Sequence, residues 1–343
     1  MKERIKSIDS LRALAILGVL LVHTTTRTLE ASEFNISGFS WTLFLNQIAR
    51  FAVPLFFIIS GFVLELSNRS ESYWSFIKRR FSKIFIPYAV WSAFYYLIIY
   101  NQNHDSFLKV ILTGNASYQL YFIPTLCIFY LIFPFIHKIY KFISNKFLLS
   151  LILLSQVFFL YKDYFVKELD LPDPVRIAIL SYFLFVIGIV AAGNIDRIKL
   201  FVNKWKYTLF ASTILLGLYV FWEGRSRFLS TGNYLAYYSQ WRPSVFIYTI
   251  LTALTFYYLF EFTKFKDSVV ARFSKHSFFV FFVHVAVLEG VWAAFGRSIF
   301  GILKSSLPGK ILFDPIFFGI VTLLSFGTSY FVHKIRRSGR ILG

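Results

Sequence analysis

The sequence predicts an all-α, polytopic integral membrane protein, and three observations support this fold class. Of the 343 residues, 57% are hydrophobic. Only 15% are charged, against roughly 25% in a typical soluble chain. The apolar residues also gather into runs of about 18 or more, long enough to cross a hydrocarbon core of ~30 Å as a helix. This composition excludes a disordered chain and a basic nucleic-acid-binding module.

Ten apolar segments qualify as transmembrane helices, although the fifth and the seventh are short. They span residues 8–26, 48–66, 84–101, 119–140, 147–161, 177–194, 207–222, 245–262, 278–295 and 316–332. We therefore expect about ten membrane-spanning helices in a single domain, residues 1–343. No appended soluble domain is expected, because little chain follows the tenth segment.

The distribution of Lys and Arg predicts which side of the membrane each connecting segment faces. With the N-terminus inside, the two termini and the even-numbered connections hold about two thirds of the 36 Lys and Arg residues. Basic residues are retained on the cytoplasmic side, whereas acids contribute little. Both termini are therefore predicted to be cytoplasmic, in agreement with an even number of helices. The net charge of +19 then reflects topology and anionic lipid headgroups rather than nucleic acid.

Other sequence features argue against alternative classes. A secretory signal peptide is disfavoured, because Arg12 interrupts the first apolar segment and no small-x-small cleavage site precedes the next polar segment. The single cysteine, Cys127, permits no intramolecular disulfide and is expected to pack in the core. The chain has no zinc-ligand spacing, phosphate-binding glycine loop, nucleophile elbow or internal repeat. We therefore expect no metal cofactor.

Two polar residues, Arg12 and His23, share one face of the first predicted helix. At about 100° per residue they return to within roughly 20° of the same direction, ~16 Å apart along the axis. A charge at the centre of a membrane helix costs about 2.5 to 3.5 kcal/mol, so it needs a partner or a wet cavity. Asp9 lies three residues before Arg12 and can pair with it. Singly, Arg12 could be an interfacial anchor and His23 a buried histidine bonded to neighbouring helices. Their shared face favours a common polar cavity.

Five stretches of the sequence resemble motifs of the acyltransferase 3 family of membrane acyltransferases. The first is residues 8–15 (IDSLRALA), which contain Asp9, Leu11 and Arg12 and are followed by His23. The other four occur in the same order as in the family. They are residues 53–62 (VPLFFIISGF), residues 78–88 (KRRFSKIFIPY), Tyr121-Phe122 with Tyr130 and Pro134, and residues 277–284 (SFFVFFVH). Two positions depart from the family pattern: Lys83 stands where Arg is common, and Tyr121 where Trp is usual.

This resemblance implies transfer of an acyl group to a hydroxyl of a cell-envelope polysaccharide or lipid-linked saccharide. The donor in the family is usually acetyl-CoA on the cytoplasmic side. An alcohol attacks a thioester slowly unless a base removes its proton, and histidine is the side chain whose pKa lies near neutrality. His23 is therefore the candidate general base, although transient acylation of His23 is an alternative. His284, which ends the last motif, is a candidate second polar group of the cavity, or else a structural histidine.

The donor carries several phosphates, which guanidinium groups bind in a bidentate manner. Arg79, Arg80 and Lys83 are candidate ligands for these phosphates. A simple cytoplasmic charge run is the alternative interpretation of all three residues. Arg12, deeper in its helix, could face the pyrophosphate or pantetheine end of the donor or support the thioester carbonyl.

Further polar residues have no motif behind them. Glu289 and Glu65 are notable only for their depth in the membrane, and Glu65 is expected to reach the inner interface. Arg50, near the outer end of the second predicted helix, could bind an anionic acceptor or a lipid headgroup. Aromatic residues in an outer connection could stack on sugar rings. These are Tyr237, Tyr238 and Trp241.

Two other functions remain open from the sequence. A saccharide transporter or flippase would also have many helices with buried charges. Such a carrier favours broken helices in paired halves, and no repeat relates the halves of this chain, although Pro54 and Pro124 interrupt helices. A ligand-sensing membrane module would have kept the fold but lost the chemistry. A chain of that kind could lack the Arg12 and His23 pair, which is present here. The sequence does not define an oligomeric state.

Overall fold

The structure is a computed structural model that describes residues 5–32, 40–68, 71–100, 105–231, 239–263, 273–303, 307–335 and 342–343. These residues form helices joined by turns and short connections, with no strand among them. Eight helical stretches are long and apolar enough to cross a membrane, and a ninth, Phe122–Lys138, is shorter. The prediction of an all-α, polytopic membrane protein is therefore confirmed.

Up to residue 193, the described residues form nine α-helices, two of which continue into a π-helical turn. They are α1 (Lys6–Ala31), α2 (Trp41–Ile48), α3 (Ala52–Leu66), α4 (Tyr73–Phe94) with η1 (Tyr95–Ile99), α5 (Phe107–Thr113), α6 (Phe122–Lys138), α7 (Tyr140–Ile143), α8 (Lys146–Tyr161) with η2 (Lys162–Val166), and α9 (Asp173–Gly193). Serine side chains begin several of these helices by accepting a backbone N–H, as Ser40 does for α2 and Ser72 for α4.

The second half of the chain contains two helices of 26 residues or more, α11 and α17. Its elements are α10 (Ile195–Lys204), α11 (Lys206–Thr231), α13 (Pro243–Phe262), η4 (Ser274–His276), α15 (Ser277–Val291) with η5 (Trp292–Gly296), α16 (Arg297–Leu303) and α17 (Leu307–Lys334). Each of the ten predicted spans coincides in the main with one helix of the fold. The number of helices that cross the membrane stays a prediction.

Helix α11 runs nine residues past its predicted end at residue 222, because the polar groups there have partners inside the protein. Glu223 accepts a hydrogen bond from Ser244 and forms a 3.3 Å ion pair with Arg242. Arg242 is fully buried and also donates to Gln47 Oε1 at 2.6 Å. A buried ion pair with satisfied hydrogen bonds is tolerated in a low-dielectric interior. This network ties α11 to α2 and to the start of α13.

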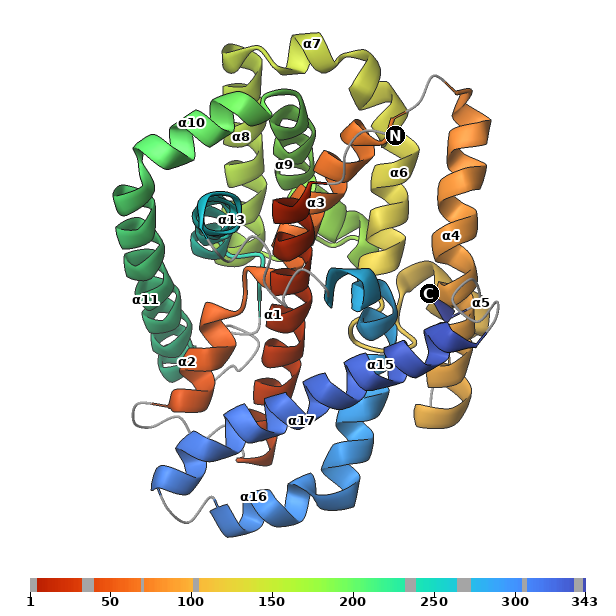
Figure 1. The fold of residues 1–343 in the computed structure, drawn as a ribbon, viewed down its shortest axis with the longest axis vertical. Helices are drawn as coiled ribbons and strands as arrows, with labels where there is room; N and C mark the ends of the chain where they lie inside the picture. The colour runs from red at the N-terminus through yellow and green to blue at the C-terminus, as the bar shows by residue number, and fades with distance from the viewer. Residues whose placement is uncertain are drawn as a thin grey trace.

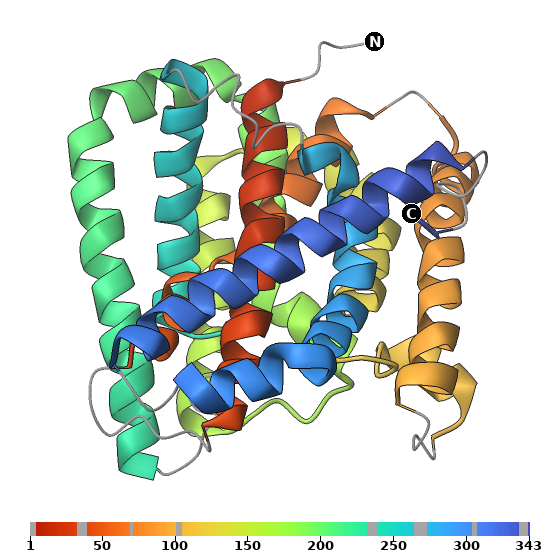
Figure 2. The same cartoon turned by 60° about the horizontal axis from the view of Figure 1, so that its bottom comes forward.

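Helix α1 is the central helix of the fold. It contacts α2, α3, α13, α15 and α17, and Figure 1 shows it running lengthwise through the middle of the molecule. Helix α17 crosses it obliquely in both ribbon views (Figures 1 and 2). Most polar residues of α1 are therefore covered by protein, whereas Lys6 and Glu30, near its two ends, are exposed.

Three of the segments predicted to be cytoplasmic lie toward one end of the molecule. Helices α7 and α10 and the beginning of α4 are toward the same end as the beginning of α1 in Figure 1. Helix α10 carries Arg197, Lys199 and Lys204. This common placement agrees with the predicted orientation, which stays a prediction.

Helices α3 and α9 pack closely together, because each places a glycine against the backbone of the other. A Cβ atom on Gly61 would collide with the carbonyl oxygen of Phe185, and one on Gly188 with the carbonyl oxygen of Ile58. Small residues allow membrane helices to approach closely and gain van der Waals contact. The second family-like motif, residues 53–62, is thus fixed by α9.

We expect Gly61→Ala to destabilise the protein, because its methyl group has no room against α9. Overpacking of this kind typically costs about 1–3 kcal/mol. Gly319→Ala in α17 is the matched control, since a Cβ there meets nothing within 4 Å and both changes raise helix propensity. Thermal unfolding in detergent micelles measures the difference. Equal melting temperatures for the two variants would contradict the close contact.

Candidate active site: two cavities along the central helix

A basic cavity of about 550 Å³ opens beside the first turns of α1. Four cationic side chains line it: Arg12 from α1, Arg80 and Lys83 from α4, and Lys275 from η4. Ser60 of α3 and Tyr130 of α6 contribute hydroxyl groups. No acidic side chain is among the described residues that line this cavity. The cavity, called the inner cavity below, therefore favours a polyanionic ligand.

Asp9 and Arg12 form the pair that their spacing predicts. Arg12 Nη1 donates to Asp9 Oδ1 at 3.2 Å. Asp9 is buried and Arg12 is partly buried. The contact directs the guanidinium along α1, where it lines the inner cavity. This local prediction is confirmed.

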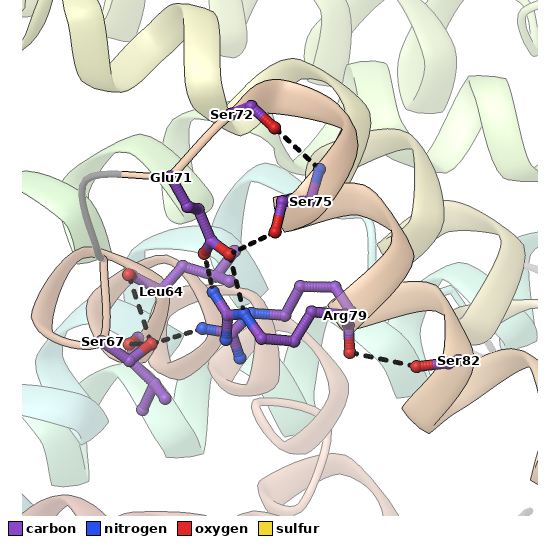
Figure 3. Close-up of polar contacts among 9 residues, drawn as sticks. Leu64, Ser67, Glu71, Ser72, Ser75, Arg79 and Ser82 are labelled. Atoms are coloured by element: carbon purple, nitrogen blue, oxygen red, sulfur yellow. Dashed lines mark hydrogen bonds and ion pairs between the residues drawn. The ribbon is translucent and has the colours of Figure 1, made fainter.

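Arg79 and Arg80 face different surroundings, although both were candidate phosphate ligands. Consecutive residues of a helix point about 100° apart. Arg79 forms an ion pair with Glu71, which Figure 3 shows together with Ser72, the N-cap of α4. Arg80 donates to Ser67 Oγ and lines the inner cavity with Lys83, one turn further along α4. The structure thus brings Arg80, Lys83 and Arg12 together and leaves Arg79 outside this group.

A second cavity of about 410 Å³, called the outer cavity below, lies further along α1. His23 and Arg27 of α1 line it together with Arg50, which is almost fully buried. Its other polar lining residues are Thr26, Glu30, Tyr118, Gln119, Tyr121, Gln240 and Glu289. Acidic and basic groups are both present, unlike in the inner cavity.

Arg27, which lines the outer cavity, contacts two carboxylates and one aromatic ring. Its guanidinium lies 5.0 Å from the centre of the Trp292 ring. Arg27 Nε is 3.6 Å from Glu289 Oε2 and Nη1 is 3.4 Å from Glu30 Oε2. Glu289, which was notable in the sequence only for its depth in the membrane, is therefore paired with Arg27 of α1.

His23 and His284 lie next to each other, although they are far apart in sequence. Their ring centroids are 5.2 Å apart, and the ring of Tyr118 is 4.8 Å from that of His23 on another side. His284 is fully buried in α15, and its Nδ1 lies 3.0 Å from the carbonyl oxygen of Val280. The resemblance had suggested both histidines for one site, and the fold brings them into ring contact.

Two phenylalanines separate the inner and outer cavities. Phe122 and Phe281 line both cavities, and their ring centroids are 5.5 Å apart. Both rings are less than 10% exposed. The expected common polar cavity is therefore two cavities that meet at this pair, with Arg12 in one and His23 in the other. Aromatic rings from α6 and α15 fill the space between them, which the spacing along α1 could not reveal.

Other polar predictions have mixed outcomes. Glu65 pairs with His137 Nδ1 at 2.8 Å, and its reach to the inner interface stays a prediction. Arg50 donates from Nε to Asn46 Oδ1 at 3.1 Å. Trp241 packs in the core 6.1 Å from the ring of Phe57, so it is not a surface for stacking on sugars. Tyr237 and Tyr238 lie outside the described residues.

Several residues that line the cavities were not among the predicted site residues. Lys275 stands just before the last family-like motif, so its position was a usable signal. Tyr118, Gln119 and Gln240 lie in connections between helices and carried no signal. Within the described part of the chain, no group of three or more His, Cys, Asp or Glu residues could hold a metal ion.

The fold and the cavities define a multi-pass membrane protein in which a cavity lined by four cations lies beside a pair of histidines, His284 buried and His23 partly buried. The chain belongs to the family described as the acyltransferase domain, which matches residues 5–334. The resemblance drawn from the five motifs is therefore confirmed, and the protein is a membrane O-acyltransferase.

Two curated relatives cover most of the chain. One, from Staphylococcus epidermidis, is named as a poly-beta-1,6-N-acetyl-D-glucosamine export protein. It is 25% identical over 320 residues, covering 85% of this chain and 84% of the relative. The other, from Bacillus subtilis strain 168, is named as the membrane-bound acyltransferase YfiQ. It is 22% identical over 298 residues, covering 82% of this chain and 80% of the relative. No solved structure matches the chain.

We expect a cysteine in the inner cavity to react only from the cytoplasmic side. The variant is Ser60→Cys in a Cys127→Ser background, treated with a membrane-impermeant thiol reagent on sealed vesicles of known orientation. Adding Phe281→Ala should admit the reagent from the outer side as well, because it removes one ring of the barrier. Glu30→Cys in the outer cavity is the control and should show the opposite sidedness. Reaction of Ser60→Cys from the outer side with both rings intact would contradict the barrier.

Proposed function

We propose that this enzyme transfers an acetyl group from cytoplasmic acetyl-CoA to a hydroxyl of a cell-envelope polysaccharide or its lipid-linked precursor. One observation carries the proposal. A cavity lined by four cations adjoins, through Phe122 and Phe281, a cavity that contains His23. A polyanionic donor in the inner cavity and an alcohol acceptor in the outer cavity can therefore meet beside the same part of α1.

The inner cavity suits the phosphates of coenzyme A. Arg12 and Arg80 offer planar guanidinium groups that bind phosphate oxygens in pairs, and Lys83 and Lys275 add point charges. With the phosphates at these cations, the pantetheine arm extends along the cavity toward Phe122 and Phe281. The acetyl end must pass between these two rings to approach His23.

In the outer cavity, His23 is the proposed general base. Its unprotonated ring nitrogen takes the proton of the acceptor hydroxyl while the oxygen attacks the thioester carbonyl. The carbon–sulfur bond then breaks, the sulfur leaves as the coenzyme A thiolate and takes up a proton, and an ester remains on the acceptor. Transient acylation of His23 is the alternative route. It would appear as a labelled enzyme in the absence of acceptor.

The outer cavity suits a saccharide. Amide, phenol and paired charged groups line it and can donate to and accept from hydroxyl groups, and Trp292 lies behind Arg27. The printed name of the Staphylococcus relative, which refers to a poly-N-acetylglucosamine, supports a polysaccharide acceptor for this chain.

Saccharide export is a second candidate, favoured by the name of the same relative. Reconstituted vesicles separate the two functions. An acetyltransferase moves label from acetyl-CoA on the cytoplasmic side onto glycan on the opposite side, and each modified hydroxyl gains about 42 Da if acetyl replaces its proton. An exporter moves the glycan without changing its mass.

We expect His23→Ala to abolish transfer, since general base catalysis typically contributes about 10²- to 10⁴-fold. Binding of acetyl-CoA should persist, because His23 lies outside the inner cavity. Transfer of radiolabelled acetyl in membranes measures the first and equilibrium binding the second. His137→Gln is a control, since His137 pairs with Glu65 away from both cavities. Full transfer by His23→Ala would remove His23 from the mechanism.

We expect the double variant Arg80→Gln with Lys83→Gln to raise the KM for acetyl-CoA by roughly 10- to 100-fold, because hydrogen bonds to charged groups contribute about 1.5–3 kcal/mol. The KM for the acceptor should change little. Lys78→Gln is the matched control, as Lys78 is an exposed cation of the same helix that does not line the inner cavity. An unchanged acetyl-CoA titration for the double variant would contradict the proposed donor site.

A further inference from the structure

A buried nitrogen beside His23 has no hydrogen-bond partner. His284 is fully buried, and its Nε2 makes no hydrogen bond within the described structure. Buried polar atoms nearly always have a partner, so each exception asks for an explanation. The ring of His284 adjoins His23, which lines the outer cavity. A partner for Nε2 is therefore expected at this site.

The other nitrogen of the ring fixes its protonation. Nδ1 of His284 lies 3.0 Å from the carbonyl oxygen of Val280. A carbonyl oxygen only accepts, so Nδ1 must carry the proton and donate it. In the neutral ring Nε2 is then an acceptor with a lone pair. Helix α15 thus presents a fixed acceptor to whatever N–H group approaches Nε2.

The described group placed to supply that N–H is the neighbouring imidazole. The ring centroids of His23 and His284 are 5.2 Å apart and their planes are tilted by 33°. At this separation a nitrogen of each ring comes within the roughly 3 Å of a hydrogen bond when the two nitrogens point toward each other. Tyr118 contacts the His23 ring, while Phe281 lies 6.3 Å from the His284 ring.

We infer that His284 is a positioning residue, whose Nε2 accepts the N–H of His23 and so leaves the other nitrogen of His23 unprotonated and facing the acceptor hydroxyl. This inference rests on the proposed role of His23 as the general base. A neutral histidine has two tautomers, and only one of them exposes a lone pair to the substrate. The fixed acceptor on His284 selects that tautomer and the ring orientation, as hydrogen-bonded partners do for other functional histidines.

Tyr95 holds the turn of α15 that carries His284. Its hydroxyl donates to the carbonyl oxygen of Phe282 at 2.6 Å and accepts from the N–H of Ala286 at 3.1 Å. These two groups lie on either side of His284 in the sequence. Tyr95 is fully buried at the start of η1, so its hydroxyl has no solvent to compete for it. Tyr95 is therefore a second positioning residue, acting through the backbone of α15.

The test compares two replacements of His284. His284→Gln keeps an acceptor oxygen near the position of Nε2, whereas His284→Leu removes it. We expect His284→Leu to lower kcat by about 10- to 100-fold, with the KM for acetyl-CoA unchanged to within about twofold. His284→Gln should recover most of the rate. Equal activity of His284→Leu and wild type would overturn the inference. Equal loss in both variants, with both folded, would also overturn it, because His284 would then have to carry a proton itself.

Tyr95→Phe provides a test in which both histidines remain. We expect a smaller fall in kcat, about three- to tenfold, with the KM for acetyl-CoA unchanged. Tyr96→Phe is the matched control, since the neighbouring hydroxyl donates to the Asp105 carbonyl oxygen at 2.9 Å, away from α15. A kcat for Tyr95→Phe equal to that of Tyr96→Phe would overturn the role of Tyr95.

A spectroscopic measurement separates this inference from the proposed function. In ¹⁵N-histidine-labelled protein in lipid nanodiscs, the shifts of the His23 ring nitrogens report its tautomer without any turnover. We expect a single tautomer in the wild type and in His284→Gln, and a mixture in His284→Leu. The same tautomer populations in all three would overturn the inference, even for an active enzyme. An ordered tautomer in a protein that transfers no acetyl group would instead refute the proposed function alone.

Discussion

Helix α1 carries Arg12 and His23 on one stripe, and the cost of exposing such groups to hydrocarbon governs how the other helices are arranged. A charge at membrane depth costs about 2.5 to 3.5 kcal/mol unless protein or water solvates it. The stripe therefore faces protein, and α3, α13, α15 and α17 surround the helix. Both cavities lie along this stripe. The helix whose polar residues need solvation therefore also lines the candidate site.

The two ends of the stripe differ in their electrostatics. The inner cavity has only cationic charged groups among its described lining residues, whereas the outer cavity pairs Arg27 with Glu289 and Glu30. Phe122 and Phe281 stand between them. In the proposed reaction, these rings keep water of the outer cavity away from the thioester until the acetyl end passes between them to approach His23.

The features that were predictable from the sequence depend on neighbours along the chain. Apolar runs predicted the helices, and the spacing of Asp9 and Arg12 predicted their ion pair, because a helix fixes the positions of residues three apart. The motifs also pointed to His23, His284, Arg80 and Lys83, which line or adjoin the cavities. Which of Arg79 and Arg80 faces the inner cavity was not predictable, since it depends on their partners Glu71 and Ser67, which lie between α3 and α4.

The sequence by itself determined the fold class, the family and the polar stripe of α1, because hydrophobicity and helical periodicity are local properties. Only the tertiary structure decided that His23 meets His284, that Lys275 joins the cations of α1 and α4, and that two aromatic rings divide the cavity. Each of these contacts joins helices far apart in the chain. Their geometry follows from close packing around α1, such as the glycine contacts between α3 and α9, and spacing along one helix contains no information about it.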